Sequence, residues 1–330
     1  MTTRTYDRPS GPSSSILGVT LTLGLALACG NSKSNTNDGG TGGAGTGGSG
    51  GSGPVTDGGS DAVTSGKIAI NGSASPFPGD PETDFTQLSL SIADPVSVLA
   101  GQDPLAKQPS FDTSAAVCPG ATCAAPFSFT DVPVDTATNT FGLLAILEDL
   151  RPGSSDGGVA AKWVRTGTGI ANQAQLGAAI ASGTLGPRPI FAVSAAFEAG
   201  LAQFVAGARA ATNGDGITGA PGSLATRGFV LAMILANDTP KPTPVAGATI
   251  APMIAANASK YVVLYPNADF TGVGAATSAT GLVLIYPSGT GLAPVGAWLV
   301  TPPAGSTATW PAQVVGAQAN GAVVLLDVSN

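Results

Sequence analysis

The chain has 330 residues, of which 43% are hydrophobic and 10% are charged, with a formal net charge of −7 and no histidine. The apolar content excludes disorder throughout, and an acidic, sparsely charged chain disfavours nucleic acid as a partner. The lack of histidine excludes catalytic triads with a histidine base and zinc sites with histidine ligands.

The first segment has the order of an export signal. Arg4 and Arg8 precede an uncharged apolar run at 16–28, and Cys29 follows directly. A basic segment followed by a short apolar run is typical of a signal peptide. The run is too short to span a bilayer, which takes about 20 apolar residues. Residues 1–28 are therefore predicted to be a removable leader.

The residues around Cys29 resemble the lipobox of bacterial lipoproteins, with Ala28 and Gly30 flanking the cysteine. The resemblance implies that Cys29 takes a diacylglyceryl group, becomes the mature N-terminus and anchors the exported chain in the cell envelope, with the outer membrane as the expected location. One alternative stays open. Residues 26–28, Ala-Leu-Ala, also fit ordinary secretory cleavage, which would release a soluble protein with a free thiol.

Residues 29–65 are predicted to be the lipidated N-terminus and a disordered tether. They consist mainly of Gly, Ser, Thr, Asn and Asp. Such a composition cannot bury a core, and a coil of this length spans roughly 30 to 35 Å. No Lys-Ser or Lys-Thr pair follows the glycines, so a phosphate-binding loop is not expected.

Residues 66–190 are predicted to form a first module resembling a β-sandwich. Alternating and β-branched runs predict strands at 66–72, 85–93, 140–148 and 160–165, with a turn region at 125–134.

Cys118 and Cys123 enclose a Pro-Gly turn in this module. Because export brings the chain to an oxidising compartment and Cys29 is assigned to lipid, we expect these two cysteines to bond to each other. The alternatives are a free or redox-active pair, or a metal site, for which no further soft ligand is present.

A helical connector is predicted over 191–222. Five apolar residues recur at helical spacing after a possible N-cap at Ser194: Phe197, Leu201, Phe204, Val205 and Ala208. This stripe could dock a partner or line a cavity, although ordinary core packing is the expected role. A weaker helix candidate lies at 172–181. The turn residues at 213–222 indicate a loop that ends the connector.

Residues 223–330 are predicted to form a second β-sandwich. Short apolar runs between Gly and Pro turns predict strands at 228–235, 244–250, 261–265, 281–286, 296–300 and 321–328. The predicted fold class is therefore mainly β, with two small β-sandwich modules joined by a short helical segment after a disordered Gly-rich tether.

Two motifs of the second module resemble the carboxypeptidase regulatory-like domain, a transthyretin-type β-sandwich. They are Pro-Val-Ala-Gly-Ala-Thr-Ile at 244–250 and Ala-Thr-Ser-Ala-Thr-Gly-Leu-Val-Leu at 276–284. The first module is similar but looser at 66–72 and 129–133, and it departs by an insertion that carries both late cysteines. These domains have no catalytic residues to carry over. The resemblance implies a structural or binding accessory role.

Four aromatic residues are candidates for a ligand surface: Trp298, Trp310, Tyr265 and Tyr286. Aromatic faces of this kind stack on sugar rings, which makes a carbohydrate or cell-wall ligand one alternative function. The repeated Tyr-Pro at 265–266 and 286–287 also fits the simpler interpretation that these side chains pack at strand ends.

Oxygen-bearing residues recur at Asp131, Asp135 and Asn139, and again in the loop at 213–215. Neither group has the spacing or the closing glutamate of a calcium loop, so turn chemistry is the expected role. No metal and no cofactor are predicted.

Hydrolysis without histidine is the rival class of function. Glycosidase chemistry needs two carboxyl groups brought together, whereas Glu148, Asp149 and Glu198 are not paired by any spacing. The expected function is therefore a non-enzymatic display or binding role in the cell envelope. Its expected partners are the membrane, through lipid on Cys29, and a protein or glycan ligand.

Overall fold

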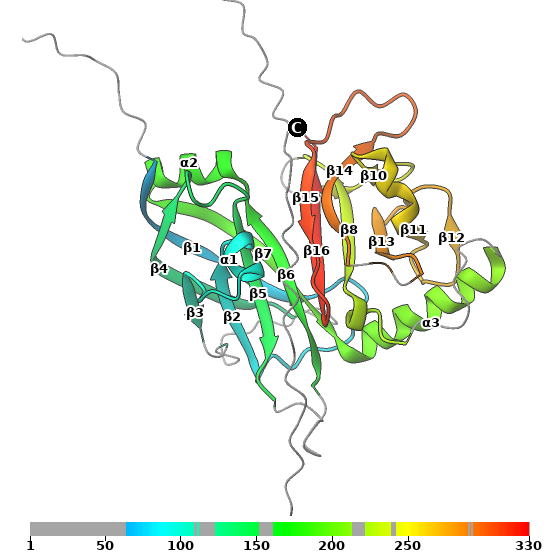
Figure 1. Cartoon of the computed structure of the whole chain (residues 1–330), viewed down its shortest axis with the longest axis horizontal. Coiled ribbons are helices and arrows are strands. Elements are labelled where there is room, and N and C mark those ends of the chain that lie inside the picture. The colour runs from blue at the N-terminus through cyan, green and yellow to red at the C-terminus, as the bar shows by residue number, and fades with distance from the viewer. Residues whose placement is uncertain are drawn as a thin grey trace, which may run out of the picture. The chain divides into compact units, whose positions relative to one another are not determined.

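The computed structural model describes residues 64–108, 111, 123–151, 161–212, 222–238, 242–289, 291 and 293–329. They belong to one compact unit, Ser60–Asn330. The predicted leader, Cys29, nearly all of the predicted tether, Cys118 and residues 213–221 of the loop predicted at 213–222 lie outside the described residues. The described part is mainly β, as predicted (Figure 1).

The first half contains the elements β1 (Ser65–Pro76), β2 (Leu88–Ala93), α1 (Pro95–Leu99), β3 (Ala106–Gln108), β4 (Ala125–Asp135), β5 (Leu143–Asp149), β6 (Trp163–Ala171), α2 (Gln173–Ser182) and β7 (Thr184–Ser194). Their inward side chains form one core cluster, which includes Ile70, Leu90, Phe127 and Leu147. The stacked rings of Phe85 and Trp163, with centroids 5.4 Å apart, close one end of it.

Most elements predicted for this half are present, but two expectations are wrong. The turn region expected at 125–134 is the strand β4, in which Phe127, Phe129, Val132 and Val134 are buried. The prolines at 126 and 133 suggested a turn. They are tolerated because β4 is hydrogen-bonded on one side only, to β1. Phe141 was expected on the buried face of the next strand, but it precedes β5 and is 42% exposed.

The second half begins with α3 (Ala195–Thr212) and the 3₁₀ helix η3 (Ala225–Arg227). It continues with β8 (Phe229–Ala236), β9 (Thr243–Pro244), β10 (Thr249–Pro252), η4 (Ala255–Lys260), β11 (Tyr261–Pro266), β12 (Val273–Gly274), β13 (Leu282–Pro287), β14 (Val295–Thr301), β15 (Gln313–Gly316) and β16 (Gly321–Val328). The predicted strand at 244–250 is wrong in its centre, since the chain turns between β9 and β10.

Both helices begin as the sequence predicts. The Ser194 hydroxyl accepts a hydrogen bond from the Phe197 amide at 3.0 Å and caps α3. At the start of α2, the Asn172 side chain accepts from the Gln175 amide while the Gln175 side chain accepts from the Asn172 amide, which is a complete capping box.

The last strand joins the two halves in one sheet. Thirteen strands are hydrogen-bonded together, and β16 lies between β6 and β8, parallel to both (Figure 1). A parallel strand with neighbours on both sides is buried on both faces, and the nearly continuous apolar sequence of β16 suits that place. The sheet therefore crosses the boundary predicted at 223.

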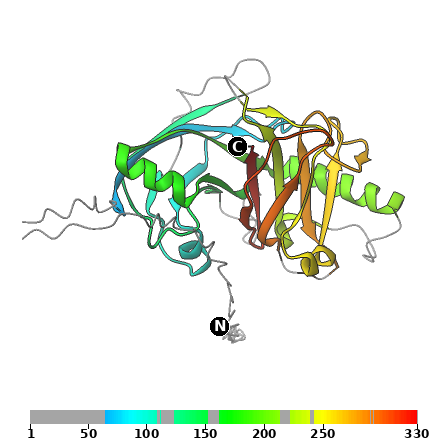
Figure 2. The same cartoon turned by 90° about the horizontal axis from the view of Figure 1, so that it is seen from above.

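The second half has three layers. On one face of the sheet, Leu201 and Val205 of α3 pack against a cluster that includes Phe229 and Leu284; Figure 2 shows α3 running along these strands. On the other face, a separate three-stranded sheet in the order β10-β14-β15 covers a cluster centred on Trp298. Among the described helices, none combines the length and hydropathy of a membrane span.

Candidate functional surfaces

The four aromatic residues expected at a ligand surface do not form one. Trp298 is 0% exposed, Tyr286 2% and Trp310 6%. The two tryptophans belong to the cluster under the three-stranded sheet, whereas Tyr286 belongs to the cluster under α3. The expected platform is therefore wrong for these residues: their rings fill two cores on opposite faces of a sheet, and a ligand cannot stack on them.

Tyr265 has a structural role that the sequence did not indicate. Its hydroxyl accepts a hydrogen bond from the Ile250 amide at 3.0 Å and donates to the Ile250 carbonyl at 3.3 Å. Burial raises the pKa of the Tyr265 phenol, so it stays protonated and can donate. Because these groups of Ile250 point away from the neighbouring strand β14, Tyr265 closes the outer edge of β10.

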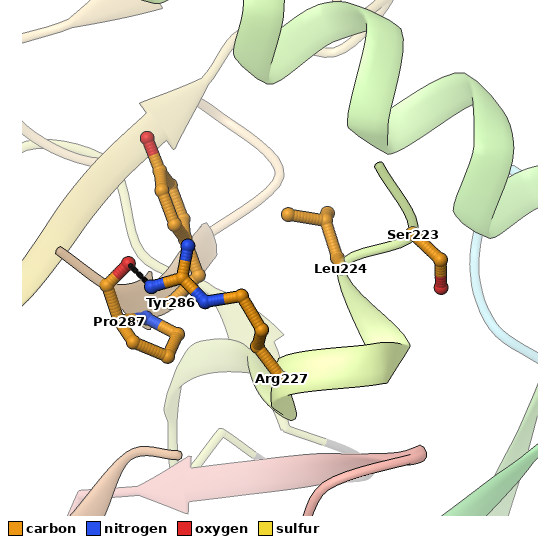
Figure 3. Close-up of a pocket in the computed structure, with 5 residues that line it drawn as sticks. All are labelled: Ser223, Leu224, Arg227, Tyr286 and Pro287. Atoms are coloured by element: carbon orange, nitrogen blue, oxygen red, sulfur yellow. Dashed lines mark hydrogen bonds between the residues drawn. The ribbon is translucent and has the colours of Figure 1, made fainter. Parts of the chain in front are cut away.

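Tyr286 lies at a small pocket lined by Ser223, Leu224, Arg227, Tyr286 and Pro287 (Figure 3). The Arg227 guanidinium lies beside the Tyr286 ring and donates to the Pro287 carbonyl at 2.9 Å. The pocket volume is about 10 Å³, which is the least that admits one water molecule. It is too small for an organic ligand.

The acids of the hydrolase hypothesis are held apart. Glu148 and Asp149 are consecutive residues of β5, so their side chains point to opposite faces. Asp149 is nearly buried and accepts from the amides of Arg151, Lys162 and Trp163 at 2.9, 2.6 and 3.0 Å. Glu198 accepts from the Ser223 hydroxyl and the Ala225 amide, both at 3.0 Å. Asp149 and Glu198 thus serve as acceptors for backbone amides.

A charged cluster lies beside Asp149. Lys162 Nζ is 2.8 Å from a Glu82 oxygen and 3.0 Å from an Asp84 oxygen, and Arg151 is 3.7 Å from Asp84. Hydrogen bonds from Thr86 and Lys162 hold the pKa of the Asp84 carboxyl well below its ordinary value. The cluster ties the β1–β2 connection to the two ends of the β5–β6 connection, and each of its two cations is paired with a carboxylate.

The structure describes only part of two other groups that the sequence singled out, the oxygen-bearing residues and the cysteine pair. The Asn139 side chain accepts from the Asp135 amide at 2.8 Å and donates to Asp94 at 3.3 Å, which is the turn chemistry expected. Within the described ranges, no group of three potential metal-binding side chains is present. Cys123 is buried and disulfide-bonded. Because Cys118 lies outside the described residues, the pairing of these two cysteines stays a prediction.

Asp327 of β16 is the buried acid that the sequence did not single out. It is 0% exposed, and burial raises the pKa of its carboxyl to about 7. One carboxyl oxygen accepts from the Gln313 side-chain amide at 3.3 Å, and the other has no partner among the described residues. The acid follows five apolar residues in an apolar strand, which could have marked it as buried.

An exposed apolar surface lies on the outer face of the β10-β14-β15 sheet, which we define by its apolar residues Ala251, Met253, Val295, Ala297, Leu299 and Val314. The register pairs Leu299 with Ala251 and Ala297 with Val314, so these side chains are neighbours. Met253 is 64% exposed, Val314 60%, Val295 50% and Leu299 45%. No charged residue occurs between Asp269 and Asp327. Contiguous apolar surface of this kind is typical of interaction sites.

Comparison with known proteins leaves the family open. No family model matches the chain, and no curated protein matches it. Solved structures that match include the shaft pilin SpaA from Lactobacillus rhamnosus GG and two of its mutants, each 10% identical to this chain. The matches cover 80 to 81% of this chain and 98% of the pilin chain, with TM-scores of 0.18. A superposition this poor carries no argument about function.

Proposed function

We propose that the chain is a lipid-anchored protein of the cell envelope, with a non-enzymatic display or binding role. The observation that carries the binding role is the outer face of the β10-β14-β15 sheet, which is apolar, exposed and without charge. The anchor is inferred from the leader and Cys29, and the outer membrane is the location that we expect.

Two features support a role without catalysis. Asp149 and Glu198, two acids of the rival hydrolase hypothesis, are occupied by backbone amides. The pocket at Arg227 is too small for a substrate. A carbohydrate ligand has less support than before, since Trp298 and Trp310, the residues expected to stack on it, are buried.

The two motifs that resemble carboxypeptidase regulatory-like domains are neighbours in the structure, as the resemblance requires of strands in one sandwich. The two motifs that carry the resemblance are bonded to each other through Thr277, whose hydroxyl accepts from the Ala248 amide at 2.9 Å and donates to the Val245 carbonyl at 2.7 Å. The parallel pairing of β16 with β8 is not part of the resemblance.

The anchor is tested by replacing Cys29 with Ser in the full chain. We expect the variant to move from the membrane fraction to the soluble fraction, because the apolar run at 16–28 is too short to hold the chain without lipid. Cys118→Ser provides a matched control, which should stay in the membrane fraction. Membrane retention of the Cys29 variant would refute the anchor, and separation of the two membranes would locate the wild-type chain.

A further inference from the structure

β15 is an edge strand whose outward backbone groups are available for pairing. The Met253 amide donates to the Ala297 carbonyl at 2.8 Å, so Ala297 faces β10 and its neighbours Gly296 and Trp298 face β15. On β15 their partners are Val315 and Gln313. The amide and carbonyl of Val314 therefore point away from β14, and no described strand is hydrogen-bonded to β15 on that side.

The exposure of the strand agrees with this geometry. Val314 is 60% exposed, and Ala312 and Gly316 on the same face are exposed as well. The amide of Val314 donates to no described group. A partner strand could supply the acceptor that this amide lacks within the described part.

Other edge strands of the described part are protected from pairing. The outward groups of Ile250 on β10 are taken by the Tyr265 hydroxyl. β4 contains two prolines, and Asp131 has a left-handed backbone (φ 56°) at an irregularity of its pairing with β1. β3 is three residues long and carries a lysine, and β12 has two residues. β15 has no proline, no charge and no bulge.

We propose that β15 pairs in antiparallel fashion with β15 of a second copy of this chain, about a two-fold axis at Val314. This inference rests on the proposed function, since it names a partner for the edge of the same sheet. In this register Val314 faces Val314 of the other copy and Ala312 faces Gly316, so no bulky pair is crowded. The two small sheets become one, and their outer faces become continuous.

The charge distribution favours a second copy as the partner. From residue 223 onward the chain has three basic and three acidic residues, so the formal net charge of −7 comes from the residues before it. Two copies of an acidic protein repel each other, and this repulsion is least where the approaching surfaces are uncharged. The three-stranded sheet meets that condition, because β10, β14 and β15 contain no charged residue.

The test places a positive or a negative charge at Val314 of the full chain. The mass of each variant is measured in detergent by gel filtration with light scattering, and the mass of bound detergent is subtracted. We expect the wild-type chain to be dimeric, and Val314→Lys and Val314→Glu each to be monomeric, since like charges face each other across the axis. An equimolar mixture of the two variants should restore the dimer. Leu299→Lys is the control: it lies on the same outer face, but its backbone groups are already bonded to β10, so it should stay dimeric.

Three results would overturn the proposed pairing of β15. A wild-type chain that is monomeric throughout would overturn the pairing, and an extended segment of another protein would then be the occupant to seek. A dimer that survives both single variants, or a mixture that fails to restore it, would also overturn the pairing at Val314. Fractionation of the Cys29→Ser variant is independent of these results, so failure of the pairing and failure of the anchor are distinguishable.

Discussion

Replacement of Asp327 by Asn is expected to stabilise the protein at pH 8. The carboxyl is fully buried, and among the described residues it accepts one hydrogen bond, from Gln313 at 3.3 Å. Burial raises its pKa from 3.8 to about 7 in the folded state. Between these two values the folded chain holds a proton that the unfolded chain has released. Stability is therefore greatest below the lower value and falls as the pH rises towards 7.

The size of the effect follows from the shift. A difference of about 3 pK units, from 3.8 to about 7, corresponds to about 4 kcal/mol of unfolding free energy lost between pH 4 and pH 7. Asn cannot ionise, so the Asp327→Asn variant should lack this loss. An amide left with a buried unpaired N–H reduces the gain, so we expect the variant to exceed the wild type by about 2 to 4 kcal/mol at pH 8.

The assay is urea denaturation at pH 4.5, 6 and 8, followed by the fluorescence of the buried tryptophans. Asp149→Asn is the matched control, because both Asp149 oxygens accept from backbone amides and an NH₂ group cannot. That variant should lose about 1 to 3 kcal/mol at pH 8. If the wild type does not lose stability relative to Asp327→Asn as the pH rises from 4.5 to 8, the reasoning about burial is refuted.

Three further outcomes are expected. Tyr265→Phe should lower the unfolding free energy by about 1 to 3 kcal/mol in urea, because the amide and carbonyl of Ile250 lose their partner; an unchanged midpoint would mean that water replaces the hydroxyl. Mass spectrometry of the unreduced, digested protein should find Cys118 bonded to Cys123, and the double Ser variant should still fold with a loss of about 2 kcal/mol; two alkylatable thiols would contradict the bridge. Proteolysis in the loop at 213–221 should leave two fragments that elute together, because β16 is hydrogen-bonded to both β6 and β8; fragments that separate without denaturant would show that the halves are independent modules.

Local patterns in the sequence were sufficient for the elements whose signals are local. The cap at Ser194 lies where the pattern places it, because an N-cap depends only on a side chain and the amides two or three residues further on. The weaker helix candidate at 172–181 is also a helix, and its cap at Asn172 was found only in the structure. The alternation at Leu88, Leu90 and Ile92 predicts a half-buried strand, and these three residues are buried in β2. A strand's period of two follows from its own backbone.

Long-range pairing could not be predicted in this way. Parallel insertion of β16 between β6 and β8 joins residues more than 150 positions apart, such as Arg165 and Gly321, and no residue near either strand specifies the other. The same limitation explains why the expected aromatic ligand surface is wrong. The sequence indicates that Trp298 and Tyr286 lie on strands, but only the stacking of layers decides which faces of those strands are covered.

The sequence alone was sufficient to predict the strand-rich composition, the two helices and the cap at Ser194, since each of these depends on neighbouring residues, whereas the export signal with Cys29 stays a prediction. The tertiary structure alone decided that Asp327 is buried, that Tyr265 closes the edge of β10, and that β15 pairs on one side only among the described strands. These properties depend on which strand lies beside which, and that order is set by the packing of the whole chain, through contacts that no short stretch of residues encodes.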